Sequence, residues 1–357
     1  MKCLKNLSST LYNADLVKNI TKLYTYKGKD FYYEVMLKQY INGIVNETIE
    51  KETDYASRLL NIKVTEARKQ RIIKHNAEPK TKDEQLLYNL KTIFVLISKK
   101  GKNMDIDDNE FLQLAKRIFD KVEDISYASY DVLEQNNTLY PEKKRKFKRD
   151  EMIEALKQFK IATVNQNIEV IGAITAFYVD LLHMNCYTSH NEFMALIIMY
   201  ALIVKSGFNL FKYESFFEAY YKNVKDFKVV TASASLNWET GFANTTMLQI
   251  EVIKLMLSCY NKIDLMLSDY KFDKSIRKID NVESAIMKLP QTFTRKDIKE
   301  ACPRLSDSTI NRALEELKDE GKIRSNGTGR SATWMKLVEN ESFQSKIKQM
   351  SIDDIVD

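Results

Sequence analysis

The loop from His183 to His190 carries the side chains best suited to chemistry in the middle of the chain. It holds two histidines and Cys186 within eight residues. A histidine at a helix end, such as His183, is a candidate general base because its ordinary pKa lies near neutral pH. Three soft donors this close together also suggest a metal, but no further ligand with suitable spacing accompanies them. We therefore predict no metal site.

Two residue types are missing around this loop. The chain has no glycine between Gly172 and Gly207 and no arginine between Arg149 and Arg277. Loops that bind phosphates use glycine to bring backbone N–H groups close to the anion, and arginine to neutralise its charge. Because both are absent, we interpret His183 as a capping or packing residue.

A second set of candidates lies in residues 274–337. This segment contains 14 Lys and Arg against 9 Asp and Glu, so most of the net charge of +6 is concentrated there. A local excess of positive charge is typical of a nucleic-acid contact, and Asn and Arg can each read a base edge through two hydrogen bonds. The candidates for base contacts are Ser308, Asn311 and Arg312. The candidates for phosphate contacts are Arg295, Lys296, Lys299, Arg324 and Arg330.

The elements that position these residues are predicted to be mostly α-helical. Gly and Pro number only 9 and 4 in 357 residues, and so few helix breakers favour helices. Apolar side chains recur at helical spacing over 168–182 and 193–204, on either side of the loop. Residues 1–120 show further amphipathic helical patterns, including an apolar stripe over 31–44.

Residues 125–140 break the helical pattern. Ser126, Tyr127, Tyr130 and Val132 lie in a stretch that predicts a short β-hairpin around a polar turn. The basic run 143–149 follows, and two interpretations of it stay open. It is either a solvated linker before the next helix or a contact to a phosphate backbone.

Residues 274–338 predict a separate module of three helices and a glycine-tipped hairpin. Thr294 caps the second helix, and Ser306 caps the third, predicted over 307–320. Ile310, Ala313, Leu314 and Leu317 form the buried stripe of that third helix. This order predicts a winged helix-turn-helix, a fold that binds DNA or, in the alternative, serves protein contact and dimerisation.

The middle of the chain resembles the core of the Fic family, enzymes that move AMP or another phosphate-containing group onto a protein hydroxyl. The resemblance rests on the helix–loop–helix around His183, the paired Tyr220-Tyr221, the turn Trp238–Gly241 and a last helix over 247–260. The Fic loop reads roughly HPFxxGNGRxxR, and of it His183 alone is kept. The acidic position, the GNG triplet and the two arginines fall on Tyr187, Thr188, Ser189, His190, Asn191 and Met194.

The resemblance implies roles for several residues. The motif histidine of Fic enzymes is the general base for the target hydroxyl, which is the position of His183. A hairpin called the flap holds the target peptide by strand addition, and Ser126, Tyr127, Tyr130 and Val132 occupy the matching place. Many Fic enzymes also carry an inhibitory helix, whose glutamate falls here on Asn42. With the phosphate ligands replaced, the resemblance implies a Fic-like scaffold that has lost its phosphate chemistry.

Together these observations predict a mostly α protein: a Fic-like helical core with a small hairpin flap, followed by a winged helix-turn-helix domain. The expected parts are an N-terminal helical region (1–120), a degenerate Fic-like core (121–271), the winged helix (274–338) and an acidic tail (339–357).

We expect a non-catalytic regulatory protein without a cofactor that binds double-stranded DNA and engages a protein partner, or itself, through the Fic-like body. The alternative is an active Fic-type transferase for protein AMPylation, with His183 as base and ATP and Mg²⁺ as cofactors. Scattered cysteines, no signal peptide and an apolar run too short to span a membrane predict a cytoplasmic location without membrane contact.

Overall fold

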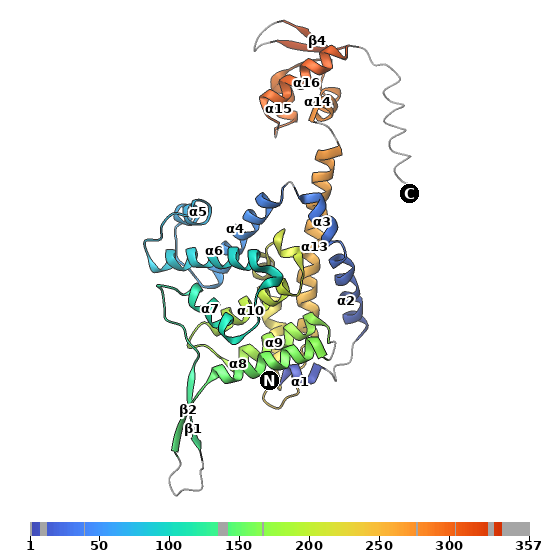
Figure 1. Cartoon of the computed structure of the whole chain (residues 1–357). Coiled ribbons are helices and arrows are strands. Elements are labelled where there is room, and N and C mark those ends of the chain that lie inside the picture. Colours follow the sequence, from blue (N-terminus) through green and yellow to red (C-terminus); the bar gives the residue numbers. More distant parts are fainter. Residues whose placement is uncertain are drawn as a thin grey trace. The chain divides into compact units, whose positions relative to one another are not determined.

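A computed structural model describes residues 2–7, 13–38, 40–134, 142–165, 168–275, 278–303, 305–327 and 332–337. The chain forms two compact units, Met1–Leu267 and Ser268–Asp357, and both are visible in Figure 1. The predicted tail 339–357 and Arg330 lie outside the described residues. None of the helices in the described part is long and apolar enough to cross a membrane.

The N-terminal unit is built from helices. The first eight are α1 (Cys3–Asn6), α2 (Ala14–Lys27), α3 (Asp30–Leu37), α4 (Ile41–Leu59), α5 (Glu66–His75), α6 (Lys82–Lys100), α7 (Asp108–Ile118) and α8 (Lys148–Lys160). They are followed by α9 (Val170–Met184), α10 (Asn191–Lys205), α11 (Phe216–Lys222), α12 (Val224–Ser235) and α13 (Thr246–Ser275). Short helical turns η2 (Gly101–Asn103), η3 (Ile161–Asn165) and η4 (Asn209–Lys212) extend α6, α8 and the segment after α10.

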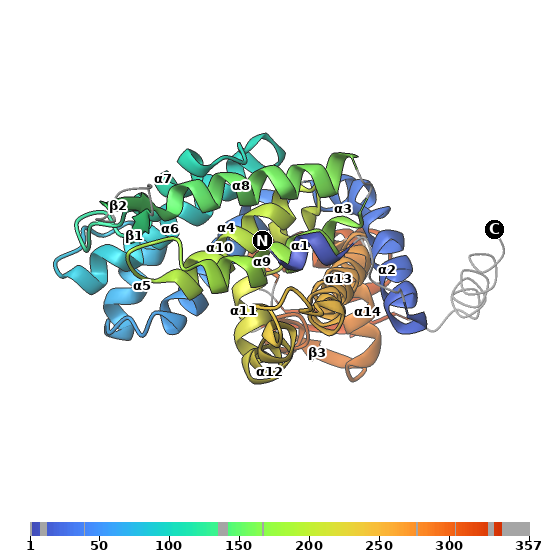
Figure 2. The same cartoon turned by 90° about the horizontal axis from the view of Figure 1, so that it is seen from below.

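Helices α9 and α10 form the centre of this unit. Nearly every residue of both is buried, as expected for helices that are apolar on all sides. They pack on each other, and α9 also contacts α1, α8 and α12 while α10 contacts α6. Figures 1 and 2 show them inside the unit, with α8 along one side. The core thus holds both ends of the loop 185–190 on rigid helices.

The predicted hairpin is present, but its second strand differs from the prediction. Strand β1 (Ser129–Glu134) pairs antiparallel with β2 (Glu142–Phe147), and Tyr130 lies opposite Lys146. The basic run 143–149 is therefore a strand followed by the first turn of α8, and its interpretation as a linker is wrong. Lysine has a low intrinsic strand preference, so only the pairing with β1 explains the extended backbone here.

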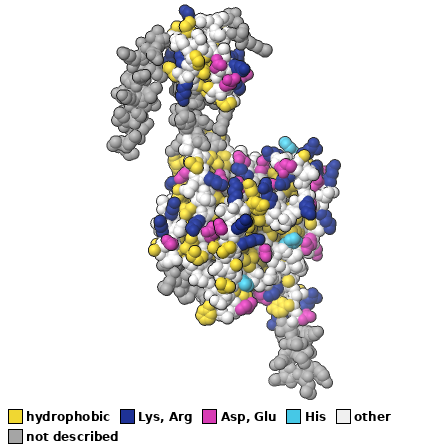
Figure 3. Space-filling model, turned by 180° about the vertical axis from the view of Figure 1, so that it is seen from behind, with side chains coloured by type: hydrophobic (Ala, Val, Ile, Leu, Met, Phe, Trp, Pro, Cys, Tyr) yellow, Lys and Arg dark blue, Asp and Glu magenta, His cyan; other side chains and the backbone are white. Residues whose placement is uncertain are grey.

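The apolar stripe over 31–44 also differs from the prediction of one continuous helix. It is divided between α3 and α4, because the chain turns between them. The N–H of Tyr40 donates to the carbonyl of Leu37 at 2.9 Å, which closes that turn. Figure 3 shows the outer surface of the N-terminal unit from one side, where basic, acidic and apolar side chains are interspersed.

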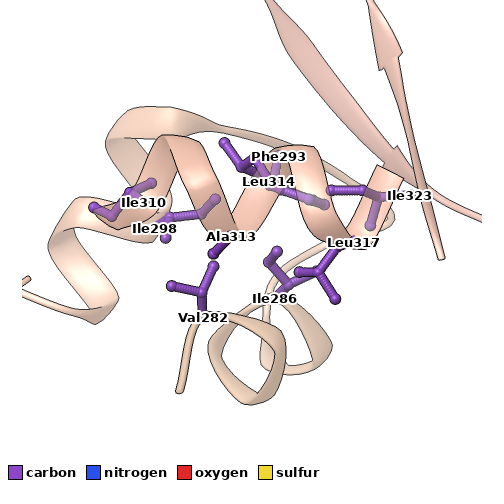
Figure 4. Packing of buried hydrophobic residues seen from close by; sticks show 9 residues of the cluster. All are labelled: Val282, Ile286, Phe293, Ile298, Ile310, Ala313, Leu314, Leu317 and Ile323. Atoms are coloured by element: carbon purple, nitrogen blue, oxygen red, sulfur yellow. The ribbon is translucent and has the colours of Figure 1, made fainter. Parts of the chain in front are cut away.

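The C-terminal unit contains α14 (Lys278–Lys288), β3 (Thr292–Thr294), α15 (Arg295–Ala301), α16 (Asp307–Asp319), β4 (Ile323–Asn326) and β5 (Thr333–Lys336). The strands form an antiparallel sheet in the order β3-β5-β4. Thr294 and Asp297 form a capping box for α15, and Ser306 caps α16. The buried cluster draws on every one of these elements except β5 (Figure 4). Its members are Val282, Ile286, Phe293, Ile298, Ile310, Ala313, Leu314, Leu317 and Ile323.

Candidate functional sites

The loop between α9 and α10 is bounded by two residues with left-handed backbone. Asn185 ends α9 at φ 47° and His190 precedes α10 at φ 54°. His190 was predicted to align with the second glycine of the Fic triplet, and it adopts a conformation that ordinarily favours glycine. Thr188, at the first glycine position, does not have a positive φ. The loop thus has a left-handed backbone at one of the two aligned glycine positions, although no glycine is present.

The backbone of this loop is hydrogen-bonded to the segment 126–128. The Thr188 N–H donates to the Ser126 carbonyl at 3.0 Å, and the Ala128 N–H donates to the Cys186 carbonyl at 2.9 Å. Tyr127 and Tyr187 form a β-bridge between these bonds, and their rings stack at 5.5 Å with an interplanar angle of 15°. The loop therefore lies along the start of the hairpin like a short added strand.

This pairing bears on the four residues predicted for peptide binding. Ser126 and Tyr127 are engaged by the chain's own loop, and the Tyr127 hydroxyl donates to the Asp108 carbonyl at 2.6 Å. Tyr130 lies on β1 with 39% of its surface exposed, and the ammonium of Lys148 lies 5.0 Å from its ring centroid. Val132 lies on the same strand.

The residues that were predicted to align with the phosphate-binding positions of the Fic motif are used for packing. Tyr187, at the acidic position, is 3% exposed, and Met194, at the second arginine position, is fully buried. Asn191, at the first arginine position, turns back onto the loop: its Oδ1 accepts from the Tyr187 N–H and its Nδ2 donates to the Tyr187 carbonyl, both at 2.8 Å. None of these three side chains offers a positive charge to a phosphate.

His183 lies in the last turn of α9 and is covered by an aromatic ring. Its imidazole stacks on the Trp238 indole at 4.5 Å with an interplanar angle of 7°. The ammonium of Lys2 lies 4.6 Å from the same indole. Partial burial lowers the pKa of His183, against the opposite effect of Glu239 and Asp180, so the neutral ring is favoured. This geometry favours a packing role.

Asp180 holds that arrangement in place. Its carboxylate is fully buried and accepts the Trp238 Nε1–H at 2.7 Å. It also accepts the backbone N–H groups of Lys2 and Cys3 at 3.1 Å and of Leu4 at 3.3 Å. A carboxylate with four donors is fully satisfied. Asp180 therefore ties the N-terminal helix and the tryptophan to α9.

The other two potential metal ligands of the loop, His190 and Cys186, are also used within the fold. His190 stacks on Phe119 at 4.2 Å, and its Nε2 lies 3.0 Å from Oε2 of Glu123. Cys186 is 1% exposed, and burial raises the pKa of its thiol to about 12. No group of three or more potential metal ligands occurs among the described residues.

Asn42, which was predicted to align with the inhibitory glutamate, lies in the first turn of α4 and is exposed. Its helix packs mainly on α5, α6, α11 and η4.

In the C-terminal unit, the predicted base-contacting residues share one exposed face. Ser308, Asn311 and Arg312 are exposed on the N-terminal half of α16, opposite its buried stripe. The guanidinium of Arg312 pairs loosely with Glu316 at 3.2 Å and stays 79% exposed. Three carboxylates of this helix, Glu315, Glu316 and Asp319, lie towards its C-terminal end.

The predicted phosphate-contacting residues are not equivalent. Lys296 is exposed on α15, and Arg324 is exposed on β4, while Arg295 is half-buried. Lys299 is engaged inside the unit, because its Nζ donates to the Leu305 carbonyl and lies 3.2 Å from the carboxylate of Asp307. A lysine one helical turn before the α15–α16 connection is a signal for such a role.

Comparisons with known proteins define the fold. No family model and no curated protein matches this chain. Among solved structures, it is similar to the crystal structure of a Fic family protein from Desulfovibrio desulfuricans G20, with a TM-score of 0.55 and 11% sequence identity. The match covers 93% of this chain and 98% of that one. The chain therefore has a mostly helical, Fic-like fold.

Proposed function

We propose that this chain is a DNA-binding regulatory protein whose C-terminal unit is a winged helix-turn-helix. The order of its elements supports this proposal: three helices with a short strand after the first, then the hairpin β4–β5. In proteins of this type the helix in the position of α16 enters the major groove. The observation that carries the proposal is the exposed face of Ser308, Asn311 and Arg312 on that helix.

Within this proposal, Asn311 and Arg312 read base edges and the exposed cations contact phosphates. Asn pairs with adenine and Arg with guanine through two hydrogen bonds, each pair contributing about 1–3 kcal/mol of discrimination. Lys296 and Arg324 fix the register on the duplex, aided by Arg295. Lys299 is left out of this set because its ammonium is engaged at the α15–α16 connection.

We further propose that the N-terminal unit is a degenerate Fic-like body without catalytic activity. The support is that Tyr187, Asn191 and Met194 are buried or hydrogen-bonded within the fold, and that the imidazole of His183 lies against Trp238. A general base must reach the proton it removes, and a transferred phosphate needs charge-assisted donors. The body then serves partner binding or self-association.

The experiment for DNA binding selects preferred duplexes from a randomised pool with the full chain. Asn311→Ala combined with Arg312→Ala should abolish the sequence preference. Lys318→Ala, on the same helix but at its other end, should leave the preference unchanged. Selection of no sequence by the wild type, or an unchanged preference in the double variant, would refute base reading by α16.

The alternative function is a Fic-type transferase that uses His183 as base with a rebuilt phosphate site. It predicts transfer of label from ATP, with Mg²⁺, to a protein hydroxyl, and loss of that transfer in His183→Ala. Labelling that depends on His183 would establish the enzyme and overturn the non-catalytic proposal.

A further inference from the structure

A cavity of about 290 Å³ lies in the N-terminal unit beside the C-terminal end of α10. Residues from α3, from the end of α6 with η2, from α10 and from η4 line it. The loop at His183 and His190 precedes the other end of α10, and a helix of 15 residues is about 22 Å long. The cavity is thus separate from the Fic-motif position.

Lysines dominate the polar lining of this cavity. Lys99, Lys100, Lys102 and Lys212 all line it, against the single carboxylate of Glu34. Four cations from two segments more than a hundred residues apart in sequence converge on one hollow. Lysine is a compact charge that binds phosphate groups well.

Some basic side chains at this end of the unit have an evident structural partner. Lys100 pairs with Glu110 at 2.5 Å. Lys27, just outside the lining, donates to the Ser206 carbonyl at 3.0 Å, and Lys205 donates to the Lys102 carbonyl at 3.1 Å. The contacts of Lys27 and Lys205 satisfy carbonyls at helix ends, which is a common role of lysine.

The other lysines lack such a partner. Within the described residues, Lys99, Lys102 and Lys212 make no ion pair. Helices α6 and α10 both end here, and each helix C-terminus carries about half a negative charge. Asp30 interacts electrostatically with both Lys27 and Lys102, so its charge offsets that of Lys27. Glu34 and the two helix ends together offset about two of the three charges of Lys99, Lys102 and Lys212, so about one remains uncompensated. The crowding also acts on Lys27, whose pKa is lowered by burial and further by Lys102, against Asp30 and Glu169.

The lining away from the lysines is apolar. Tyr200, Phe208 and Phe211 line the cavity together with the lysines, and these residues are 3%, 1% and 4% exposed. A charge held against an apolar surface attracts an anion more strongly than one in open water, because the local dielectric is lower. The volume lies at the low end of ligand sites, which excludes a dinucleotide.

We propose that this cavity binds a compact phosphorylated anion, of the size of pyrophosphate or a short phosphate ester, with Lys99, Lys102 and Lys212 as its ligands. This site does not depend on the proposed DNA binding, and it uses none of the residues at the Fic-motif positions.

The test is a calorimetric titration of the full chain with inorganic pyrophosphate at low salt. Lys99→Ala combined with Lys212→Ala should weaken binding at least tenfold, since one charge-assisted contact of about 1.4 kcal/mol corresponds to tenfold. Lys99 is exposed and Lys212 is half-buried, and neither makes an ion pair within the described residues, so the fold should tolerate the change. Lys225→Ala combined with Lys228→Ala, two exposed lysines of α12, removes the same charge elsewhere and should leave binding unchanged.

Several results would overturn the proposal. The first is that the wild type shows no saturable pyrophosphate binding. The second is that the control variant weakens binding equally. The third is that citrate, an anion of similar charge without phosphate, binds with equal affinity. Duplex DNA binding that is weakened by Lys99→Ala/Lys212→Ala would assign the lysines to nucleic acid instead. Loss of DNA binding in the α16 variant alone leaves the pyrophosphate result unaffected, so the two proposals fail independently.

Discussion

Glu52 provides the sharpest test of how the core of the N-terminal unit is built. Its carboxylate is 1% exposed and accepts from the Ser215 hydroxyl at 2.6 Å and from the N–H groups of Phe216 and Phe217 at 2.9 and 2.7 Å. Burial nevertheless raises the pKa of Glu52 from 4.5 to about 7, against these hydrogen bonds. Desolvation therefore raises the pKa of Glu52 by more than the hydrogen bonds to its carboxylate lower it.

The sign of the pH dependence follows from that shift. The folded-state pKa lies above the unfolded value, so between pH 4.5 and about 7 the folded chain holds a proton that the unfolded chain has released. The stability from this proton is fully present below pH 4.5 and is lost as pH rises through 7. A pKa difference of about 2.5 corresponds to about 3 kcal/mol of lost stability.

The measurement is urea unfolding at several pH values in a Trp334→Phe background. Trp238 then remains as the single tryptophan and reports on the N-terminal unit. Glu52→Gln cannot titrate, so its stability should fall by about 3 kcal/mol less between pH 4.5 and 7.5 than that of the parent. Glu47→Gln, an exposed glutamate on the same helix, should keep the parental profile. Identical pH profiles for the parent and Glu52→Gln would refute the argument from desolvation.

Three further substitutions test the packing around the loop between α9 and α10. Asp180→Ala leaves four donors without an acceptor and should destabilise the N-terminal unit by about 3 kcal/mol or more, whereas the exposed Asp226→Ala should change thermal unfolding little. His183→Ala removes the stacking on Trp238 and should cost about 1 kcal/mol of unfolding free energy, with DNA affinity unchanged; a larger loss of DNA binding would contradict a packing role. Met194→Arg places an arginine at the fully buried position that was aligned with the second arginine of the Fic motif. It should prevent stable folding rather than create ATP binding, and a folded variant that binds ATP would contradict the packing interpretation.

Features that depend only on neighbouring residues could be predicted from the sequence. Thr294 and Ser306 predicted the starts of α15 and α16 because a capping side chain bonds to an N–H three residues on. The stripe of α16, from Ile310 to Leu317, predicted its buried face because helical periodicity requires no knowledge of the partner.

Features that depend on distant partners were not predicted from the sequence. Strand β2 is a lysine-rich run that becomes extended through pairing with β1, and β3 has three residues that pair with β5. The bridge between Tyr127 and Tyr187 joins segments 60 residues apart. The lysine-lined cavity was also missed, since its residues come from separate helix ends and form no motif.

DNA binding by the C-terminal unit can be tested through the salt dependence of binding. Fluorescence anisotropy of a labelled duplex is measured with the full chain from 50 to 200 mM salt. We predict a linear fall of log K with log salt. The slope should be shallower by about 1.8 in Arg295→Ala/Lys296→Ala, since each lost phosphate contact contributes about 0.9. No binding at 50 mM salt, or an unchanged slope in that variant, would contradict DNA binding through the C-terminal unit.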